Sequence, residues 1–285
     1  MKRILIILSL LGVLSAAWIP ASQAAVLLPP DVFGLQYDQF RSFSIAQMLY
    51  DGIVSGDPWD TAAGTGGLDV LAYTGATGQN NVNVGIAPNL YSFPDPLAAP
   101  SGSTSTFSGI WGLGGTISVD SLYGYLQDTF ASSIPVFLFD MNEPGTAAKR
   151  DLQITAEIRI MDGTTVVDSW SFDGINDGVY QSTAWATAYG LIPSFFDPTT
   201  LISSNRGNGK VDFVAYAMGL DLADFQGMGY TFEGEFNMQG LDGSFEELYL
   251  TGAFAPPTTI PEPATLLLMG AGLLIATLGA ALRKQ

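Results

Sequence analysis

The sequence predicts an all-β protein whose body is an antiparallel, jelly-roll-like β-sandwich. Several short segments alternate apolar and polar residues with a period of two, and Gly, Asp and Asn separate these segments. The length agrees, because about 230 residues lie between two apolar terminal segments, and all-β domains of that size are common. We therefore expect one large sandwich domain over residues 25–255.

The most regular alternation runs from Leu152 to Ile160 and predicts a half-buried strand. Asp162-Gly163 separates it from a second segment, Thr165 to Phe172, which is rich in β-branched and aromatic residues. A short Asp-Gly turn between two such segments predicts a β-hairpin.

A second hairpin is predicted near the end of the body. Residues 230–238 alternate, and Asp242-Gly243 separates them from another strand-like segment over residues 245–251. Further strands are expected at four places: Leu68 to Tyr73, Asn81 to Ile86, Ile134 to Phe139 and Val211 to Met218. The segment from Ile134 to Phe139 is apolar on both faces, so we expect it to lie deep in the core.

Three regions depart from this strand pattern. Residues 40–54 fit either a strand or a short helix, and helices near Ala46 and Ser121 are compatible with the sandwich. Pro, Ser, Gly and Thr dominate between Pro88 and Ser108. That composition predicts a long surface loop.

The N-terminal segment has the order of a secretory signal peptide. Lys2 and Arg3 precede an apolar run that reaches about Ile19, and small residues follow it. Small side chains suit cleavage after Ala24, and cleavage after Ala25 is the alternative. We therefore assign residues 1–24 as a signal peptide that signal peptidase removes.

The C-terminal segment is long enough to cross a membrane. Nineteen uncharged residues from Ala264 to Leu282 would form a helix of roughly 28 Å, close to the thickness of a hydrocarbon core. Arg283 and Lys284 follow it, and such basic residues stay on the cytoplasmic side. The sequence thus predicts a single transmembrane helix with a basic end over residues 264–285. The preceding linker, residues 256–263, is proline-rich, which keeps it out of helix and sheet.

The run Ile260-Pro261-Glu262-Pro263-Ala264-Thr265, the apolar span after it and the basic finish together resemble the PEP-CTERM sorting signal of exosortase substrates. The resemblance covers about residues 258–285 and says nothing of the body. It implies a bacterium with an outer membrane and an extracellular polysaccharide. It also implies an integral-membrane exosortase that acts near Pro261, Glu262 and Pro263, with Arg283 and Lys284 as the basic end. The precursor would be tethered to the inner membrane and the product delivered to the cell surface or extracellular matrix.

Composition narrows the range of partners. The chain has 27 acidic and 10 basic residues, a formal net charge of −17. Such a surface repels nucleic acid and anionic lipid. It is compatible with divalent cations, cationic partners or neutral glycans.

The chain has no cysteine and no histidine. Without cysteine it is not a disulfide-stapled scaffold, so burial of a core must hold it together. The absence of histidine excludes Ser-His-Asp and Cys-His nucleophile systems, HExxH zinc sites and histidine acid–base catalysis. The G-x-S-x-G and phosphate-binding P-loop motifs are also absent. We therefore expect no enzyme activity and no catalytic or cofactor-binding residues.

One pair of carboxylates keeps a catalytic alternative open. Glu233 and Glu235 lie two apart on a predicted strand, so both point to one face about 7 Å apart. That separation falls in the range of inverting glycosidases. Thr231 occupies the position two before Glu233, so the E-x-D-x-E pattern of sandwich-fold glucanases is incomplete. The favoured interpretation is two solvated carboxylates on the outer face of the strand.

Two segments could supply oxygen ligands to Ca²⁺, although turns explain both more simply. The segment from Asn205 to Asp212 partly matches a calcium loop, with Asn208 and Asp212 as ligands. The other segment contains Asp173, Asn176 and Asp177 within ordinary Asp-Gly turn chemistry. We predict no resident cofactor or metal, with Ca²⁺ as the alternative.

The sequence favours a structural or adhesive protein of the cell surface or extracellular matrix without catalysis. The alternative is a carbohydrate-binding or carboxylate-only glycosidase-like sandwich. Tryptophans could form a sugar-stacking platform in that case, although core or loop packing is the simpler interpretation. These tryptophans are Trp59, Trp111, Trp170 and Trp185. Exosortase, signal peptidase and an extracellular polysaccharide are the expected partners.

Overall fold

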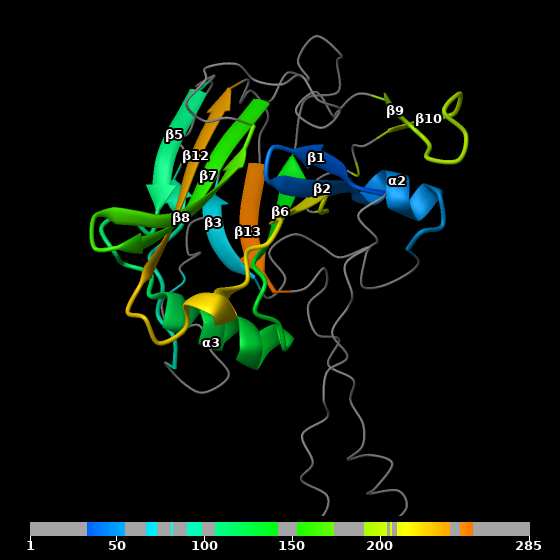
Figure 1. Ribbon diagram of the computed structural model, residues 1–285. Coiled ribbons are helices and arrows are strands. Elements are labelled where there is room, and N and C mark those ends of the chain that lie inside the picture. Colours follow the sequence, from blue (N-terminus) through cyan, green and yellow to red (C-terminus); the bar gives the residue numbers. More distant parts are fainter. Residues whose placement is uncertain are drawn as a thin grey trace, which may run out of the picture. The chain divides into compact units, whose positions relative to one another are not determined.

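The computed structural model describes residues 33–54, 67–72, 81, 90–98, 106–141, 153–173, 191–203, 206, 210–239 and 246–252. All of them belong to one unit, Ala25–Pro256. Most of these residues form β-strands in several sheets, with few helices, which confirms the all-β prediction (Figure 1). None of the helices in these ranges is long and apolar enough to cross a membrane. The predicted signal peptide, proline-rich linker and C-terminal helix lie outside the described residues.

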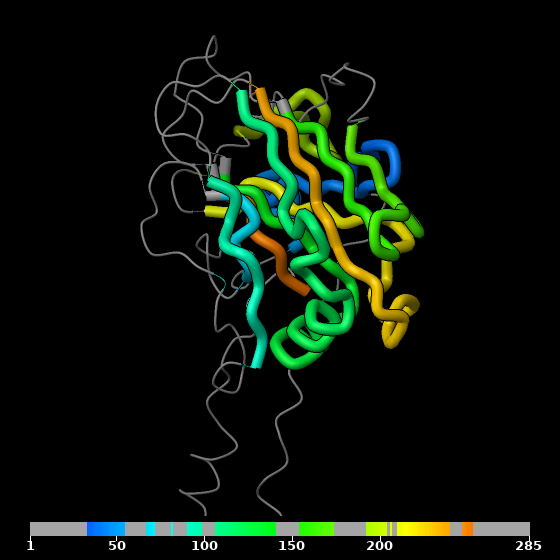
Figure 2. Tube along the Cα trace, turned by 90° about the vertical axis from the view of Figure 1, so that its left-hand side faces the viewer, coloured from blue at the N-terminus to red at the C-terminus, as the bar shows by residue number. Residues whose placement is uncertain are grey.

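Two sheets face each other. The larger contains, in spatial order, β1 (Leu35–Tyr37), β2 (Phe40–Ser44), β11 (Phe213–Ala217), β6 (Val136–Met141), β13 (Glu246–Thr251), β3 (Leu68–Ala72) and β4 (Leu97–Ala98). The smaller contains β5 (Thr106–Trp111), β12 (Thr231–Gln239), β7 (Gln153–Asp162) and β8 (Thr165–Phe172). Figure 2 shows β5, β12 and β7 side by side on the face turned to the viewer. A separate pair is formed by β9 (Leu191–Pro193) and β10 (Leu201–Ser203).

Strand periodicity explains the main core. On β7 the side chains of Ile154, Ile158 and Ile160 point to one face, and on β12 Phe232 and Phe236 do the same. They share one buried cluster with Phe137, Phe139, Leu248 and Leu250 of the larger sheet. The rings of Phe137 and Phe236 meet across it, with 6.4 Å between their centroids. The two sheets therefore enclose a single hydrophobic layer.

Helix α3 (Val119–Phe130) closes one end of this layer (Figure 1). The side chain of Ser118 accepts a hydrogen bond from the backbone N–H of Ser121, which caps the N-terminus. Ala131, at φ 53°, ends the helix in the left-handed conformation. A short 3₁₀ helix, η3 (Leu222–Phe225), packs beside α3.

The middle strands of the larger sheet are buried on both faces. A second cluster on its other face contains Val136 and Leu138 of β6, together with Ile45 and Met48 of α2 (Ile45–Tyr50). Since Phe137 and Phe139 belong to the main core, β6 is covered on both sides, as its apolar sequence predicts. Residues 40–54 combine the two structures they allow, because β2 leads directly into α2.

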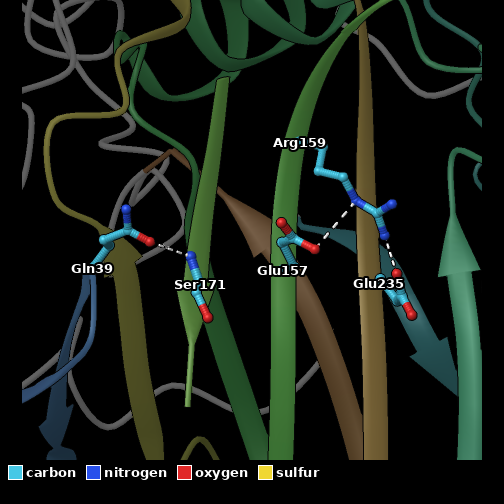
Figure 3. Close-up of polar contacts among 5 residues, drawn as sticks. All are labelled: Gln39, Glu157, Arg159, Ser171 and Glu235. Carbon is cyan, nitrogen blue, oxygen red and sulfur yellow. Dashed lines mark hydrogen bonds and ion pairs between the residues drawn. The ribbon is translucent and has the colours of Figure 1, made fainter. Parts of the chain in front are cut away.

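The β1–β2 turn joins the two sheets at one edge. The backbone N–H of Gln39 donates to the Ser171 carbonyl of β8 at 3.1 Å, and the Gln39 Oε1 accepts from the Ser171 N–H at 2.7 Å (Figure 3). The Gln39 carbonyl also accepts from the N–H of Met218, directly after β11 of the larger sheet, at 2.8 Å. This contact covers part of the edge strand β8.

The structure corrects several of the predicted strand arrangements. The β7–β8 hairpin forms as predicted. The prediction of a second hairpin is wrong, because β12 and β13 lie in different sheets. The predicted loop from Pro88 to Ser108 contains β4 and the start of β5, and Phe93 within it is buried. The sheets are also not wholly antiparallel, since β3 and β4 pair in parallel.

Candidate functional site

The outer face of the smaller sheet carries the carboxylates that the sequence singles out. In the register of β12 against β7, Glu233 lies opposite Arg159 and Glu235 opposite Glu157. Alternation places all four on the face away from the core, because Phe232 and Phe236 occupy the other face of β12. The prediction that Glu233 and Glu235 share a face is therefore confirmed.

Arg159 neutralises the pair formed by Glu157 and Glu235. Its guanidinium reaches across from β7 and donates through Nη2 to Glu235 Oε2 on β12. Its Nε lies 3.7 Å from Glu157 Oε2 on its own strand. Figure 3 shows the arginine between the two carboxylates. Two like charges that face each other across the strands thus share one cation, which offsets their repulsion.

Glu233 is bound differently. Its side chain is 7% exposed, and Oε1 accepts a hydrogen bond from the backbone N–H of Gly114 at 3.2 Å. Gly114 lies in the turn after β5 with φ 74°, a conformation that favours glycine. The expectation of a solvated carboxylate is therefore wrong for Glu233, since the turn folds over it.

These contacts limit the chemistry of the face. An inverting glycosidase needs one carboxylic acid and one carboxylate that both reach the substrate, with room for water between them. Here Glu235 is ion-paired with Arg159 and Glu233 is buried against a turn. The arrangement resembles a set of cross-strand contacts that hold β7, β12 and the turn after β5 together.

The candidate calcium ligands that the structure describes have local roles. Asp212 is buried, and its Oδ1 accepts from the Arg206 N–H at 2.9 Å, which supports the turn interpretation. Asp173 is also buried, at φ 58°. Asn208, Asn176 and Asp177 lie outside the described residues. Within the described ranges, no group of three or more acidic side chains could hold a metal ion.

Two of the four tryptophans considered as a sugar-stacking platform belong to the core. Trp111 on β5 and Trp170 on β8 are 1% and 6% exposed. Trp111 packs edge-to-face on Phe232 with 6.4 Å between centroids. Neither ring is available as a sugar-stacking platform, as the packing interpretation predicts. Trp59 and Trp185 lie outside the described residues.

Asp69 on β3 and Glu247 on β13 form a second carboxyl pair. The sequence did not predict this pair. The strands pair antiparallel with a register shift between Leu248 and Tyr249. Burial, the charge of Glu247 and a hydrogen bond between the two carboxyls raise the pKa of Asp69 from 3.8 to about 6. Burial and then the charge of Asp69 also raise the pKa of Tyr125 on α3. The raised pKa favours the protonated form of Asp69 beside Glu247.

Asn81 fixes the backbone of Asp69. Its Oδ1 accepts from the Asp69 N–H at 3.0 Å, and its Nδ2 donates to the Asp69 carbonyl at 2.6 Å. The same Nδ2 donates to the Pro94 carbonyl at 3.0 Å. Asn81 is 2% exposed, so these bonds satisfy a buried amide. The clamp holds β3 beside the segment that precedes β4.

The substitution Asp69→Asn is expected to stabilise the protein at neutral pH, where the ionised Asp69 carboxylate of the wild type lies beside Glu247. In the wild type the raised pKa favours folding fully below pH 3.8, and this contribution is lost as the pH rises through about 6. An amide donates to Glu247 at every pH. At pH 7.5 the variant should gain on the order of 1 kcal/mol in unfolding free energy, after allowance for solvent screening of a half-buried group.

Urea unfolding at pH 4.5 and at pH 7.5 measures this difference. The matched control is Asp95→Asn, because Asp95 is exposed. A gain of equal size at both pH values, or an equal gain in the control, would show that the carboxyl pair is not its origin.

The sorting and processing residues lie outside the described ranges. They are Pro261, Glu262, Pro263, Arg283 and Lys284, and the predicted signal cleavage sites are Ala24 and Ala25. Their assignment therefore depends on the sequence and on comparison with known families.

Two family models match separate parts of the chain. The family described as "Domain of unknown function (DUF8239)" matches residues 26–214, and the PEP-CTERM protein-sorting motif matches residues 259–284. The second match contains Pro261, Glu262, Pro263, Arg283 and Lys284 and confirms the resemblance inferred from the sequence. No curated protein and no solved structure matches the chain. The first match starts just after Ala25 and ends inside β11.

Proposed function

We propose, from the premise that the chain belongs to the DUF8239 family and ends in a PEP-CTERM protein-sorting motif, that it is a non-catalytic structural or adhesive component of the cell surface or extracellular matrix. The motif marks it as an exported protein that exosortase sorts from a membrane-associated precursor. The single observation that carries the proposal is this motif behind a β-rich body.

Physical reasoning supports this order of segments. An uncharged helix of 19 residues would hold the exported body at the outer leaflet. The prolines at 256, 257, 261 and 263 favour an extended backbone with fewer donors, which a processing enzyme can bind. The first segment exports the chain, and the second holds it for processing.

Three observations favour a role without catalysis. The chain has no histidine or cysteine. Glu235 is engaged by Arg159, and Glu233 by the turn after β5. A sandwich with two hydrophobic clusters, whose edge strand β8 is hydrogen-bonded to the β1–β2 turn, instead suits a structural role. Its negative charge makes a neutral polysaccharide a better partner than an anionic one.

Deletion of residues 256–285 is expected to abolish surface delivery. The full chain and the deleted chain would be expressed in a host that carries exosortase, and both would be quantified in periplasm, membrane, surface and medium. The full chain should pass through a membrane-associated precursor to the surface or matrix, whereas the deleted chain should stay soluble in the periplasm.

A matched control separates recognition from membrane insertion. Replacement of Pro261, Glu262 and Pro263 by alanine keeps the apolar span, so this chain should accumulate as an unprocessed membrane precursor. Equal distribution of the full and deleted chains would refute sorting. Sorting followed by free release into the medium, without retention on cells or matrix, would refute the structural role.

A further inference from the structure

Strand β8 is an outer strand of the smaller sheet. Among the described strands it pairs with β7 on one side and with none on the other. Its first half is exposed, and Val166 and Val167 are 47% and 42% exposed. An open edge with exposed β-branched residues can pair with the edge strand of another molecule. Strand β8 is therefore a place where a second copy of the chain could add a strand.

The hydrogen bonds of β8 show which of its backbone groups face outward. The N–H of Ser171 donates to the Gln39 side chain at 2.7 Å, and its carbonyl accepts from the Gln39 N–H at 3.1 Å (Figure 3). In an antiparallel pair, outward-facing residues alternate with those that bond to the partner strand. Ser169 is therefore the next residue whose N–H and carbonyl point away from β7.

The side chain of Asp168 occupies the outward N–H of Ser169. Its Oδ1 accepts from this N–H at 2.9 Å. Asp168 is also exposed, so it places a negative charge on the open edge. An added strand would have to displace the Asp168 carboxylate before it could bond to Ser169, and a second copy would bring an equal charge to the same edge.

A bulge interrupts the edge nearer the β7–β8 turn. The register of β7 against β8 shifts between Ile160 and Met161. Their partners are Asp168 and Val166, so Val167 between them has no counterpart on β7. An extra residue of this kind disturbs the regular alternation of backbone groups and bends the strand. A regular partner strand could therefore not extend its hydrogen bonds through this part of β8.

The outward groups of Ser171 are occupied by Gln39. This one residue uses both its N–H and its side-chain oxygen toward Ser171. Its own carbonyl accepts from the N–H of Met218, directly after β11, at 2.8 Å. Gln39 thus takes the place of one residue of a neighbouring strand and is itself tied to the larger sheet.

The β1–β2 turn holds Gln39 in this position. Tyr37 pairs with Phe40. The loop is therefore Asp38 and Gln39, and Asp38 adopts φ 48°, a conformation common in tight two-residue loops. The buried rings of Tyr37 and Phe40 both contact Phe172 of β8, with 5.0 and 5.5 Å between centroids. Since the core anchors both ends of the loop next to β8, Gln39 loses little conformational entropy when it binds this strand.

We propose that the β1–β2 turn, with Gln39 at its tip, is a plug that keeps β8 from pairing with the same strand of a second copy. The plug, the Asp168 carboxylate and the bulge at Val167 act on successive positions of one edge. Together they leave too short a run of outward groups for a partner strand to bond to. The inference concerns the state of association, and it stands whether or not the chain reaches the matrix.

Cross-linking is a specific test because the chain has no native cysteine. Val167→Cys is introduced into the purified full-length chain, in a mild detergent that covers the predicted C-terminal helix, and treated with a short bis-maleimide. With the plug in place, dimers should not form at this position. Adding Gln39→Ala and Asp168→Ala frees the N–H groups of Ser171 and Ser169, so cross-linked dimer should rise about tenfold.

Hydrogen exchange measures the plug directly, in dilute solution where the chain is monomeric. In Gln39→Ala the amide of Ser171 should exchange about three- to tenfold faster, because its acceptor is lost. The matched control is Gln39→Glu, which keeps a side-chain oxygen at the same place. Its Ser171 amide should remain protected, and its cross-linking should stay low.

The cross-linking control is Met228→Cys, because Met228 is exposed and lies outside β8. Equal cross-linking at Met228 and Val167 would mean that the chains associate elsewhere. Strong cross-linking of Val167→Cys with Gln39 and Asp168 intact would show that the edge is already open. The proposal is also wrong if the added substitutions do not increase cross-linking, or if the Ser171 amide exchanges no faster in Gln39→Ala. Loss of cooperative unfolding in Gln39→Ala would show that the turn is needed for folding and is not a plug.

Discussion

A chain that ends at residue 214, where the DUF8239 match ends, is expected not to fold. This chain lacks β12 and β13, which are interior strands: β12 pairs with both β5 and β7, and β13 pairs with both β6 and β3. Six apolar side chains of these strands are at most 2% exposed: Phe232, Phe236, Met238, Leu248, Tyr249 and Leu250. Their burial contributes roughly 10 kcal/mol or more, which is comparable to the whole stability of a typical domain.

Circular dichroism and thermal unfolding measure the effect. The chain of residues 25–214 should show neither a β-sheet spectrum nor a cooperative transition. The matched control is the chain of residues 25–255, which retains every described strand and should unfold in one transition. A cooperative transition in the shorter chain would show that the family match is a domain by itself and that β12 and β13 only add to it.

The structural body thus extends beyond the family match. The match ends within β11, yet both sheets need strands that come later in the chain. Long-range pairing of this kind makes the end of the body as important as its start, because β13 separates β6 from β3 in the larger sheet.

Local signals predicted local structure. The Asp-Gly turn and the alternation around it predicted the β7–β8 hairpin, and the two apolar faces of residues 134–139 predicted the depth of β6. The same turn signal at Asp242-Gly243 misled, because a turn residue indicates a change of direction but not the sheet that the next strand enters. β12 precedes that point and β13 follows it, and the two strands lie in different sheets.

At the candidate site, too, local geometry was predictable from the sequence and long-range contacts were not. Two glutamates two residues apart on a strand share a face by geometry alone, so their orientation was predictable. Their partners were not, since Arg159 comes from a cross-strand register and Gly114 from a turn far away in sequence. Asp69 and Glu247 meet only because β3 pairs with β13. No local sequence pattern predicts that pairing.

Replacement of Arg159 by methionine is expected to destabilise the protein by about 2–3 kcal/mol at pH 7. The side chains of Arg159 and Glu235 are 17% and 27% exposed, so removal of the cation leaves partly buried carboxylates without compensation. Glu157 and Glu235 lie directly opposite each other, where like charges repel. Methionine keeps most of the side chain's apolar volume, so the loss reports on charge rather than on packing.

A second substitution distinguishes this electrostatic cause from a packing defect. Urea unfolding at pH 7 measures the deficit of Arg159→Met, and adding Glu235→Gln should restore part of the stability because one unpaired carboxylate is removed. The matched control is Arg41→Met, because Arg41 donates to the uncharged oxygens of Gly34 and Gln36. Adding Glu235→Gln to Arg41→Met should restore nothing. A deficit in Arg159→Met that Glu235→Gln leaves unchanged would mean that packing, not charge, couples β7 to β12.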